Sequence, residues 1–197
     1  MTAIVKVDFL EQRSQGSETK PVDSTVELRR YALVLAIYLN TRGCGFVLFE
    51  GHMSPFDWGM REIRGPRKHG RCVTRIIKKF DRYLPDVVVL QGTSPEGAQR
   101  ARRIADFNAA IAELAKSRGI PVYLYSRDQV RAAFDYLGCV NKHALAEVIA
   151  KHIPALERYV PPRKPWMSEN ARMGIFDAAA LGLRLVYSIN RKDRQAT

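Results

Sequence analysis

The sequence predicts an α/β fold, built as one mixed five-stranded sheet with helices on both faces. Three strand patterns follow one another without a helix between them, and two further strand patterns alternate with helical segments. Consecutive strands joined by short turns pair antiparallel, whereas strands separated by helices pair in parallel through right-handed crossovers. One sheet covered by helices satisfies both patterns, and a length of 197 residues suits a single domain.

The first three strands are expected at residues 32–39, 43–50 and 56–64. The first is a continuous apolar run, and the second follows a tight turn that contains glycine. In the third, side chains two residues apart fall on one face of the strand. The members of that face are Phe56, Trp58, Met60 and Glu62.

The rest of the chain alternates helices with strands. A first helix is closed by Pro85 and carries apolar residues at helical spacing, namely Val73, Ile76, Ile77, Phe80 and Leu84. The run 86–90 is apolar on both faces, as expected of a central strand, and residues 120–125 form the last strand. Further helices are expected at about 104–114, 127–137, 142–152 and 171–188.

Composition sets the expected domain boundaries. Residues 1–30 are expected to form a polar, mobile N-terminal segment, residues 31–190 one folded domain, and residues 191–197 a basic C-terminal tail. The chain opens without a signal-peptide pattern, and its longest apolar run is too short to cross a bilayer. Its three cysteines form no CxxC pair, which favours reduced thiols. These features predict a cytoplasmic protein without a membrane partner.

The chain is strongly basic. Its 32 Lys and Arg residues against 20 Asp and Glu give a net charge of +12 and a pI near 9.9. This excess favours a polyanionic partner, above all nucleic acid, although a basic protein with no such partner has the same composition. The stretch 61–82 alone carries nine basic and two acidic residues. Solvated helix faces are the alternative explanation for such a run.

The basic clusters supply candidate nucleic-acid contacts. Lys and Arg bind phosphates and so set affinity, and a neighbouring Trp can hold an unstacked base. The side chains expected at this interface from clustering are Arg42, Arg67, Lys68, Arg71, Arg75, Lys78, Lys79, Arg100, Arg102, Arg103, Arg163, Lys164 and Trp166. The sequence contains no zinc-binding motif and no phosphate-cradling loop of nucleotide triphosphatases.

Several stretches together resemble the RuvC-type Holliday junction resolvases. The apolar first strand leads into the turn TRGCGF, and the segment YSRDQVR is similar to the family's Tyr-x-x-x-Gln-Val-basic helix. The segment GCVNK resembles its Gly-x-x-x-Lys turn, and the final helix, MGIFDAAALGLRL, resembles its Ala-Asp-Ala-Leu-Ala helix. The resemblance covers roughly residues 32–188. It implies an RNase H-like fold, DNA as the partner, and a homodimer.

The chemistry of that family implies what its site contains. Two Mg²⁺ ions assist phosphodiester hydrolysis, and four acids hold them at the ends of the first and fourth strands and on the last helix. The corresponding residues here are Tyr38, Gln91, Gly174 and Asp177, so three of the four acids are replaced. Arg131 and Lys142 stand where the family has lysines near the scissile phosphate. By resemblance, Asp177, Gln91 and Lys142 form a vestigial or remodelled catalytic set, with Asp177 as the metal ligand.

Asp177 also has an explanation that involves no metal. It lies in an apolar stretch, and a buried carboxylate is costly unless it is paired. The expected partners are Arg172, Arg184 and the nearby basic loop.

Three functions are compatible with these residues. The first is a RuvC-like protein that recognises branched or duplex DNA, or RNA, by backbone contacts and has a degraded two-metal site. The second is an active, structure-selective endonuclease that uses Mg²⁺ or Mn²⁺ in a remodelled site. Besides Asp177 and Gln91, that site would use one of Glu169, Glu50 and Asp57. The third is a protein-interaction scaffold with no nucleic-acid role, because fold alone does not fix function.

Overall fold

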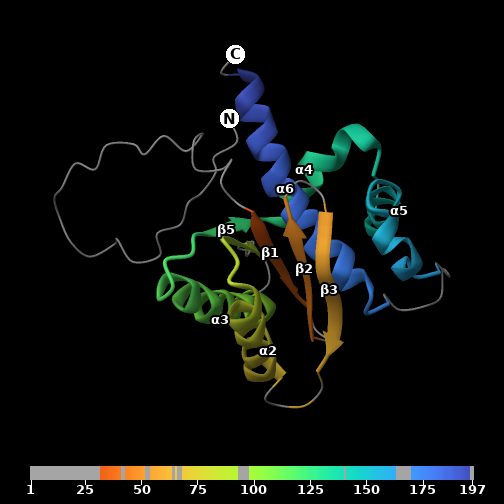
Figure 1. Cartoon of the computed structure of the whole chain (residues 1–197). Coiled ribbons are helices and arrows are strands. Elements are labelled where there is room, and N and C mark those ends of the chain that lie inside the picture. Colours follow the sequence, from red (N-terminus) through yellow and green to blue (C-terminus); the bar gives the residue numbers. More distant parts are fainter. Residues whose placement is uncertain are drawn as a thin grey trace.

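The structure is a computed structural model of the whole chain, shown in Figure 1. It describes residues 32–40, 43–51, 54–63, 65, 68–92, 98–139, 141–162 and 170–195. The polar N-terminal segment expected at residues 1–30 lies outside the described residues. Most of the expected basic tail does not form a separate segment, since the last helix continues to Gln195.

A five-stranded sheet forms the centre of the fold, in the strand order β3-β2-β1-β4-β5. Its strands are β1 (Leu33–Leu39), β2 (Gly43–Glu50), β3 (Ser54–Glu62), β4 (Val87–Gln91) and β5 (Val122–Tyr125). The first three strands pair antiparallel, and β4 and β5 join in parallel beside β1. The predicted mixed sheet is therefore confirmed, with the fourth strand beside the first.

Helices cover both faces of the sheet, as predicted (Figure 1). One face carries α2 (Lys68–Tyr83) and α3 (Ala98–Lys116). The other face carries α4 (Arg127–Phe134), α5 (Lys142–His152) and α6 (Met173–Gln195), together with the short 3₁₀ turns η1 (Asp135–Leu137) and η2 (Pro154–Tyr159). Helix α6 lies across β1 and β2, so this central helix is held by the most buried part of the sheet.

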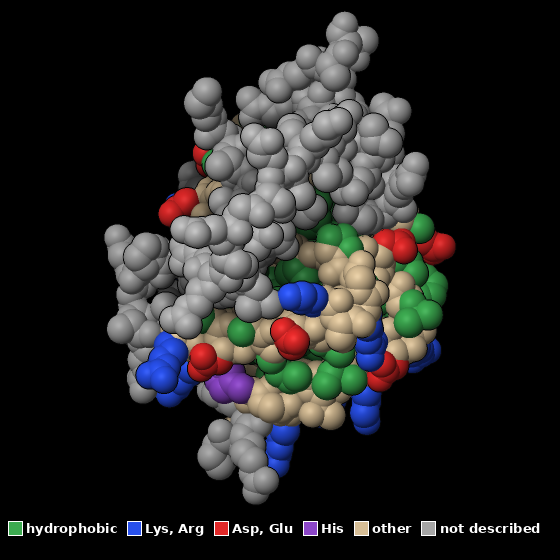
Figure 2. Space-filling view, turned by 90° about the vertical axis from the view of Figure 1, so that its left-hand side faces the viewer, with side chains coloured by type: hydrophobic (Ala, Val, Ile, Leu, Met, Phe, Trp, Pro, Cys, Tyr) green, Lys and Arg blue, Asp and Glu red, His purple; other side chains and the backbone are tan. Residues whose placement is uncertain are grey.

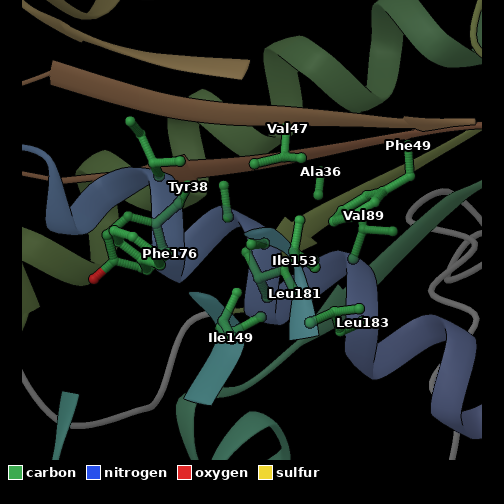
Figure 3. Packing of buried hydrophobic residues seen from close by; sticks show 14 of the residues in the cluster. Ala36, Tyr38, Val47, Phe49, Val89, Ile149, Ile153, Phe176, Leu181 and Leu183 are labelled. Carbon is green, nitrogen blue, oxygen red and sulfur yellow. The ribbon is translucent and has the colours of Figure 1, made fainter. Parts of the chain in front are cut away.

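Alternation along β1 divides the core into two layers. Ala36 and Tyr38 face α6, whereas Leu35 and Ile37 face α2 and α3. Figure 3 shows the α6 layer, in which Tyr38 and Phe176 lie at one end and Leu183 at the other. All of these side chains are buried, as expected of a strand covered on both faces.

The third strand departs from its predicted alternation at a β-bulge. Leu48 pairs with Asp57 and Phe49 pairs with Pro55, which leaves Phe56 as the extra residue. The Phe56 ring therefore packs edge-on against Tyr83 of α2, with the ring centroids 5.7 Å apart. Trp58 and Met60 both face the α6 layer, so the expected common face is confirmed for these two residues and is wrong for the bulged residue Phe56.

Helix α2 ends one residue earlier than its apolar pattern indicates. Leu84 was expected on the buried face, but it has a positive φ of 47° and is 69% exposed. The physical reason is the following residue, because proline disfavours the helical conformation in the residue before it. Phe80 is therefore the last residue of α2 that is buried in the core.

The three cysteines are free thiols, as expected. Cys44 of β2 and Cys72 of α2 are both buried, and a hydrogen bond between them together with burial raises the pKa of the Cys44 thiol. A neutral thiol of this kind behaves as a small apolar side chain.

Candidate functional site

A cavity of about 470 Å³ opens where the parallel strands end. Tyr38 lies near the carboxyl end of β1, and Gln91 and Tyr125 are the last residues of β4 and β5. Parallel pairing brings these three ends to the same edge of the sheet, where α/β folds commonly bind ligands. The other lining residues are Arg127, Val130, Arg131, Phe134, Cys139, Asn141, Lys142, Leu145, Asp177, Ala180 and Leu181.

Local capping fixes where the lining helices begin. Ser126 is the N-cap of α4, and its Oγ accepts a 3.2 Å hydrogen bond from the Gln129 backbone N–H. The Ser126 backbone N–H in turn donates a 2.8 Å hydrogen bond to Gln129 Oε1. Asn141 caps α5 by accepting hydrogen bonds from two backbone N–H groups, those of His143 and Ala144. The cap places Lys142 in the first turn of α5, at the mouth of the cavity.

Lys142, Asp177 and Tyr38 form a polar trio at the cavity. The Lys142 ammonium lies 3.0 Å from Asp177 Oδ2 and 3.4 Å from the Tyr38 hydroxyl, and 5.4 Å from the centre of the Tyr38 ring. The Asp177 side chain is 13% exposed and that of Lys142 is 32% exposed. Tyr38 of β1 and Asp177 of α6 thus meet at the cavity, and Lys142 contacts both.

Lys142 pairs with Asp177 and was not among the partners expected; the basic loop, which was, lies outside the described residues. Arg184 instead donates to the Gln129 carbonyl and to the Ser188 hydroxyl. Lys142 could not be expected as a partner from spacing, because it is 35 residues away and reaches Asp177 only through the packing of α5 on α6.

The position corresponding to the family's third acid is tightly packed. A Cβ atom on Gly174 would meet the Met60 sulfur at 2.8 Å and the Asn40 amide nitrogen at 3.3 Å. A Cβ atom on Gly45 of β2 would overlap the Gly174 carbonyl oxygen. The first turn of α6 therefore rests on the backbone of β2, and any side chain at position 174 requires Met60 to move.

Gln91 places an unsatisfied acceptor at the cavity. Its backbone carbonyl accepts a 2.7 Å hydrogen bond from the Asn108 side chain, but its buried Oε1 has no hydrogen-bond partner among the described residues. A buried polar oxygen is costly without a donor. Burial also raises the pKa of the Tyr125 hydroxyl and of the Cys139 thiol, so both lining groups are neutral at pH 7.

The described residues do not form a site that fits two divalent ions. Asp177 is the one acidic side chain among the residues that line the cavity, and no group of three His, Cys, Asp or Glu side chains in the described ranges could hold a metal ion. Glu50 pairs with Leu33 at the opposite end of β1, and Asp57 faces α2. Neither can complete the remodelled site, and Glu169 lies outside the described residues.

The basic residues expected to bind nucleic acid fall in different places. Arg131 and Lys142 line the cavity, and Arg102 and Arg103 are exposed on α3. On α2, three exposed residues share one face at helical spacing, namely Arg71, Arg75 and Lys78. The Lys79 ammonium instead pairs with Asp57 at 2.5 Å. Residues Arg42, Arg67, Arg163, Lys164 and Trp166, and the side chains of Lys68 and Arg100, lie outside the described part.

On one face of the molecule, the described charges of both signs are mixed (Figure 2). Figure 2 shows one face of the molecule, on which the described Lys and Arg side chains stand apart, with acidic and hydrophobic ones between them. Arg127 also lines the cavity, one helical turn before Arg131, and was not expected from the sequence. The spacing of four residues on one helix was the available signal.

Known structures share this fold. No protein-family model matches the sequence, and no curated protein matches it. Thermus thermophilus RuvC in complex with a Holliday junction substrate aligns with a TM-score of 0.61 at 18% sequence identity, covering 81% of this chain and 96% of that chain. A further Thermus thermophilus RuvC structure aligns with a TM-score of 0.60 at 20% identity over the same shares. The chain therefore has a RuvC-like, RNase H-like fold.

The site can bind an anion. Among the described residues, three cationic side chains and one carboxylate line the cavity, and Arg127 and Arg131 have no ion-pair partner there. Guanidinium groups one turn apart suit a phosphate, which accepts several hydrogen bonds at once. No helix in the described part of the chain is long and apolar enough to cross a membrane.

Proposed function

We propose that this protein is a RuvC-like nucleic-acid-binding protein whose two-metal nuclease site is degraded. It would recognise branched or duplex DNA by contacts to backbone phosphates and by shape. The observation that carries this proposal is the ion pair between Lys142 and Asp177, since it joins the one carboxylate among the described lining residues to a lysine ammonium.

This ion pair opposes metal binding in two ways. The Lys142 ammonium neutralises the charge that would attract Mg²⁺, and it lies within 3.0 Å of the oxygen that a metal ion would need. Mg²⁺ also demands near-ideal octahedral oxygen coordination and gives up its waters reluctantly. Gln91 offers only an uncharged amide oxygen, so the described cavity lacks the carboxylate charge that two divalent ions require.

The charge of the cavity favours phosphate binding without a metal. With Arg127, Arg131 and Lys142 against Asp177, the described part of the cavity lining is net positive. The chain as a whole carries +12, which adds sequence-independent attraction to a polyanion. That the fold can accept a four-way junction is supported by the similar RuvC, which was solved in complex with a Holliday junction substrate.

A binding titration tests the proposal. Affinity for a four-way junction and for a duplex of equal length would be measured in EDTA and in Mg²⁺, over a range of salt. We expect binding in EDTA, with log affinity falling against log salt by about 0.9 per phosphate contact. A requirement for Mg²⁺ in binding would contradict a site based on Lys142. Failure to bind any nucleic acid would favour the protein-interaction scaffold as the function.

The charge pattern gives this test a matched control. Replacing Arg75 and Lys78, on the exposed face of α2, by Glu should weaken binding and flatten the salt dependence. Replacing Lys116 and Lys151 by Glu changes the net charge equally at two exposed positions on other helices. Equal losses from the two double variants would show that only total charge matters.

A second candidate function is an active endonuclease with a remodelled site. It is favoured by the unsatisfied Oε1 of Gln91, which lies at the same cavity as Asp177 and is a possible oxygen ligand. Junction cleavage in Mg²⁺ or Mn²⁺ that Asp177→Asn abolishes would establish it. Sedimentation of the protein with and without junction DNA would test the homodimer that the resemblance implies. Binding to an RNA junction would test RNA as the alternative nucleic acid.

A further inference from the structure

We infer that the cavity at the strand ends is a receptor for a single unpaired nucleotide, with its phosphate on the two arginines of α4 and its base in the apolar half. This inference rests on the proposed function where the nucleotide belongs to a DNA strand. It also applies to a free mononucleotide, which presents the same chemistry.

Two arginines of α4 form the end of the cavity that suits a phosphate. Arg127 and Arg131 are one turn apart on the same face of α4, and both line the cavity. Both are exposed, so their guanidinium groups reach the rim, where a phosphate can stay partly hydrated. Because they have no ion-pair partner among the described residues, no carboxylate must be displaced when a phosphate binds.

The deeper part of the cavity is lined by apolar side chains that suit a base. Tyr38, Tyr125 and Phe134 are each at most 7% exposed, and they line the cavity together with Leu145 and Leu181. Rings and branched aliphatic groups offer a surface on which a flat heteroaromatic ring packs, and stacking on aromatic side chains tolerates any base. The volume of about 470 Å³ lies in the range of small-molecule sites.

The unsatisfied acceptor supplies a third, independent feature. The Oε1 atom of Gln91 is buried at the cavity with no donor among the described residues. A base bears N–H groups on its pairing edge, and these are exposed only when the nucleotide is unpaired. One such N–H would satisfy Oε1, whereas an inorganic phosphate at the rim would leave it without a donor. The cavity therefore suits a ligand that combines a phosphate with a ring that bears a hydrogen-bond donor.

The first measurement uses the full chain and small ligands. 2′-Deoxyadenosine 5′-monophosphate, 2′-deoxyadenosine and inorganic phosphate would be titrated separately by calorimetry. We expect the nucleotide to bind at least about tenfold more tightly than either part. Gln91→Leu and Arg127→Ala/Arg131→Ala should each remove that advantage. The control Lys116→Ala/Lys151→Ala, which has the same net charge as the arginine double variant, should retain it.

The second measurement places the nucleotide in DNA. A duplex with one unpaired adenosine nucleotide would be compared with a duplex that carries an abasic residue at that position. We expect the base to improve affinity on the order of tenfold, and Gln91→Leu to remove the improvement while leaving the abasic duplex bound equally well. Val130→Trp, which fills the cavity without a charge change, gives an independent check.

The outcomes separate this inference from the proposed function. Equal binding of both duplexes, with no nucleotide advantage in the first measurement, overturns the receptor and leaves DNA binding intact. Nucleotide binding without DNA binding supports the receptor and overturns the proposed function. Absence of any binding, to the nucleotide and to either duplex, overturns both. Binding of inorganic phosphate as tightly as the nucleotide would also overturn the receptor, because the base would then contribute nothing.

Discussion

Two regions of the molecule use the same three residue types for different ends. On the α2 face, Lys79 pairs with Asp57 at 2.5 Å, and the Tyr83 hydroxyl donates to the same carboxylate at 2.9 Å. At the cavity, Lys142 pairs with Asp177 and donates to the Tyr38 hydroxyl. We call these the α2 trio and the cavity trio.

The surroundings of each lysine distinguish the two trios. The Lys79 ammonium lies 4.4 Å from the centre of the Phe46 ring and 5.3 Å from that of Tyr83, so it is enclosed between aromatic rings and joins β3 to α2. The Lys142 ammonium faces an open cavity with two further cations. A Lys–Asp–Tyr trio is thus structural where packing closes around it, and available for ligands where a cavity remains.

The largest expected effect comes from a substitution that displaces the first turn of α6, and the cavity trio with it. Gly45→Ala forces a Cβ atom into the Gly174 carbonyl oxygen, so the first turn of α6 must shift and Asp177 with it. We expect a loss of about 3 kcal/mol in the free energy of unfolding, measured with denaturant. Gly70→Ala, in α2 where a Cβ meets nothing within 4 Å, is the control and should not destabilise. An unchanged stability in Gly45→Ala would contradict the close approach of α6.

Removing each carboxylate sharpens the comparison further. Asp57→Ala leaves Lys79 between two rings without its counter-ion, and we expect about 2 kcal/mol of destabilisation. Asp177→Ala should cost less than about 1 kcal/mol, because the half-buried Lys142 can turn to the solvent in the cavity. Equal costs would mean that the cavity trio is as structural as the α2 trio.

The same pair of variants differs in DNA binding. If the proposed DNA binding holds, Asp177→Ala removes the one described carboxylate that competes with phosphate at the cavity, so affinity should rise several-fold and the salt slope should steepen by about 0.9. Asp57→Ala adds the same charge at the α2 trio and serves as the control. Parallel increases in both variants would assign the effect to net charge.

The smallest effect concerns the two tyrosines. Burial, with the hydrogen bond to Asp57, raises the pKa of the Tyr83 hydroxyl above its usual value of 10. A raised folded pKa gives stability that is fully present below about pH 10 and is lost as the pH rises through the folded pKa. Tyr83→Phe should remove this part of the alkaline loss, and Tyr38→Phe should keep it, in denaturation curves taken across that range. Identical alkaline profiles would contradict the hydrogen bond to Asp57.

The sheet could be predicted because its order follows from local patterns. Apolar runs mark each strand, and the presence or absence of a helix between strands decides parallel or antiparallel pairing. The bulge at Phe56 could not be predicted, because a period of two continues through the sequence and the extra residue appears only in the pairing register. The exposure of Leu84 could have been predicted from Pro85.

The cavity was predictable only in part. Strand ends and the last helix converge in this fold, so Tyr38, Gln91 and Asp177 were expected together. The pairing of Asp177 with Lys142 was not, because it depends on where the Asn141 cap starts α5 and on how α5 packs on α6. Long-range ion pairs are decided by tertiary packing, which residue spacing in one sequence does not encode.

The bulge in β3 has a consequence for how copies of this chain can meet. β3 is an edge strand, and an edge offers unpaired backbone groups to any other strand that arrives. Here Pro55 lacks a backbone N–H, and the bulge at Phe56 breaks the regular ladder beside it. Extension of the sheet from one molecule into the next is therefore disfavoured along this side. The irregular edge of β3 therefore protects this highly basic protein against aggregation through its sheet.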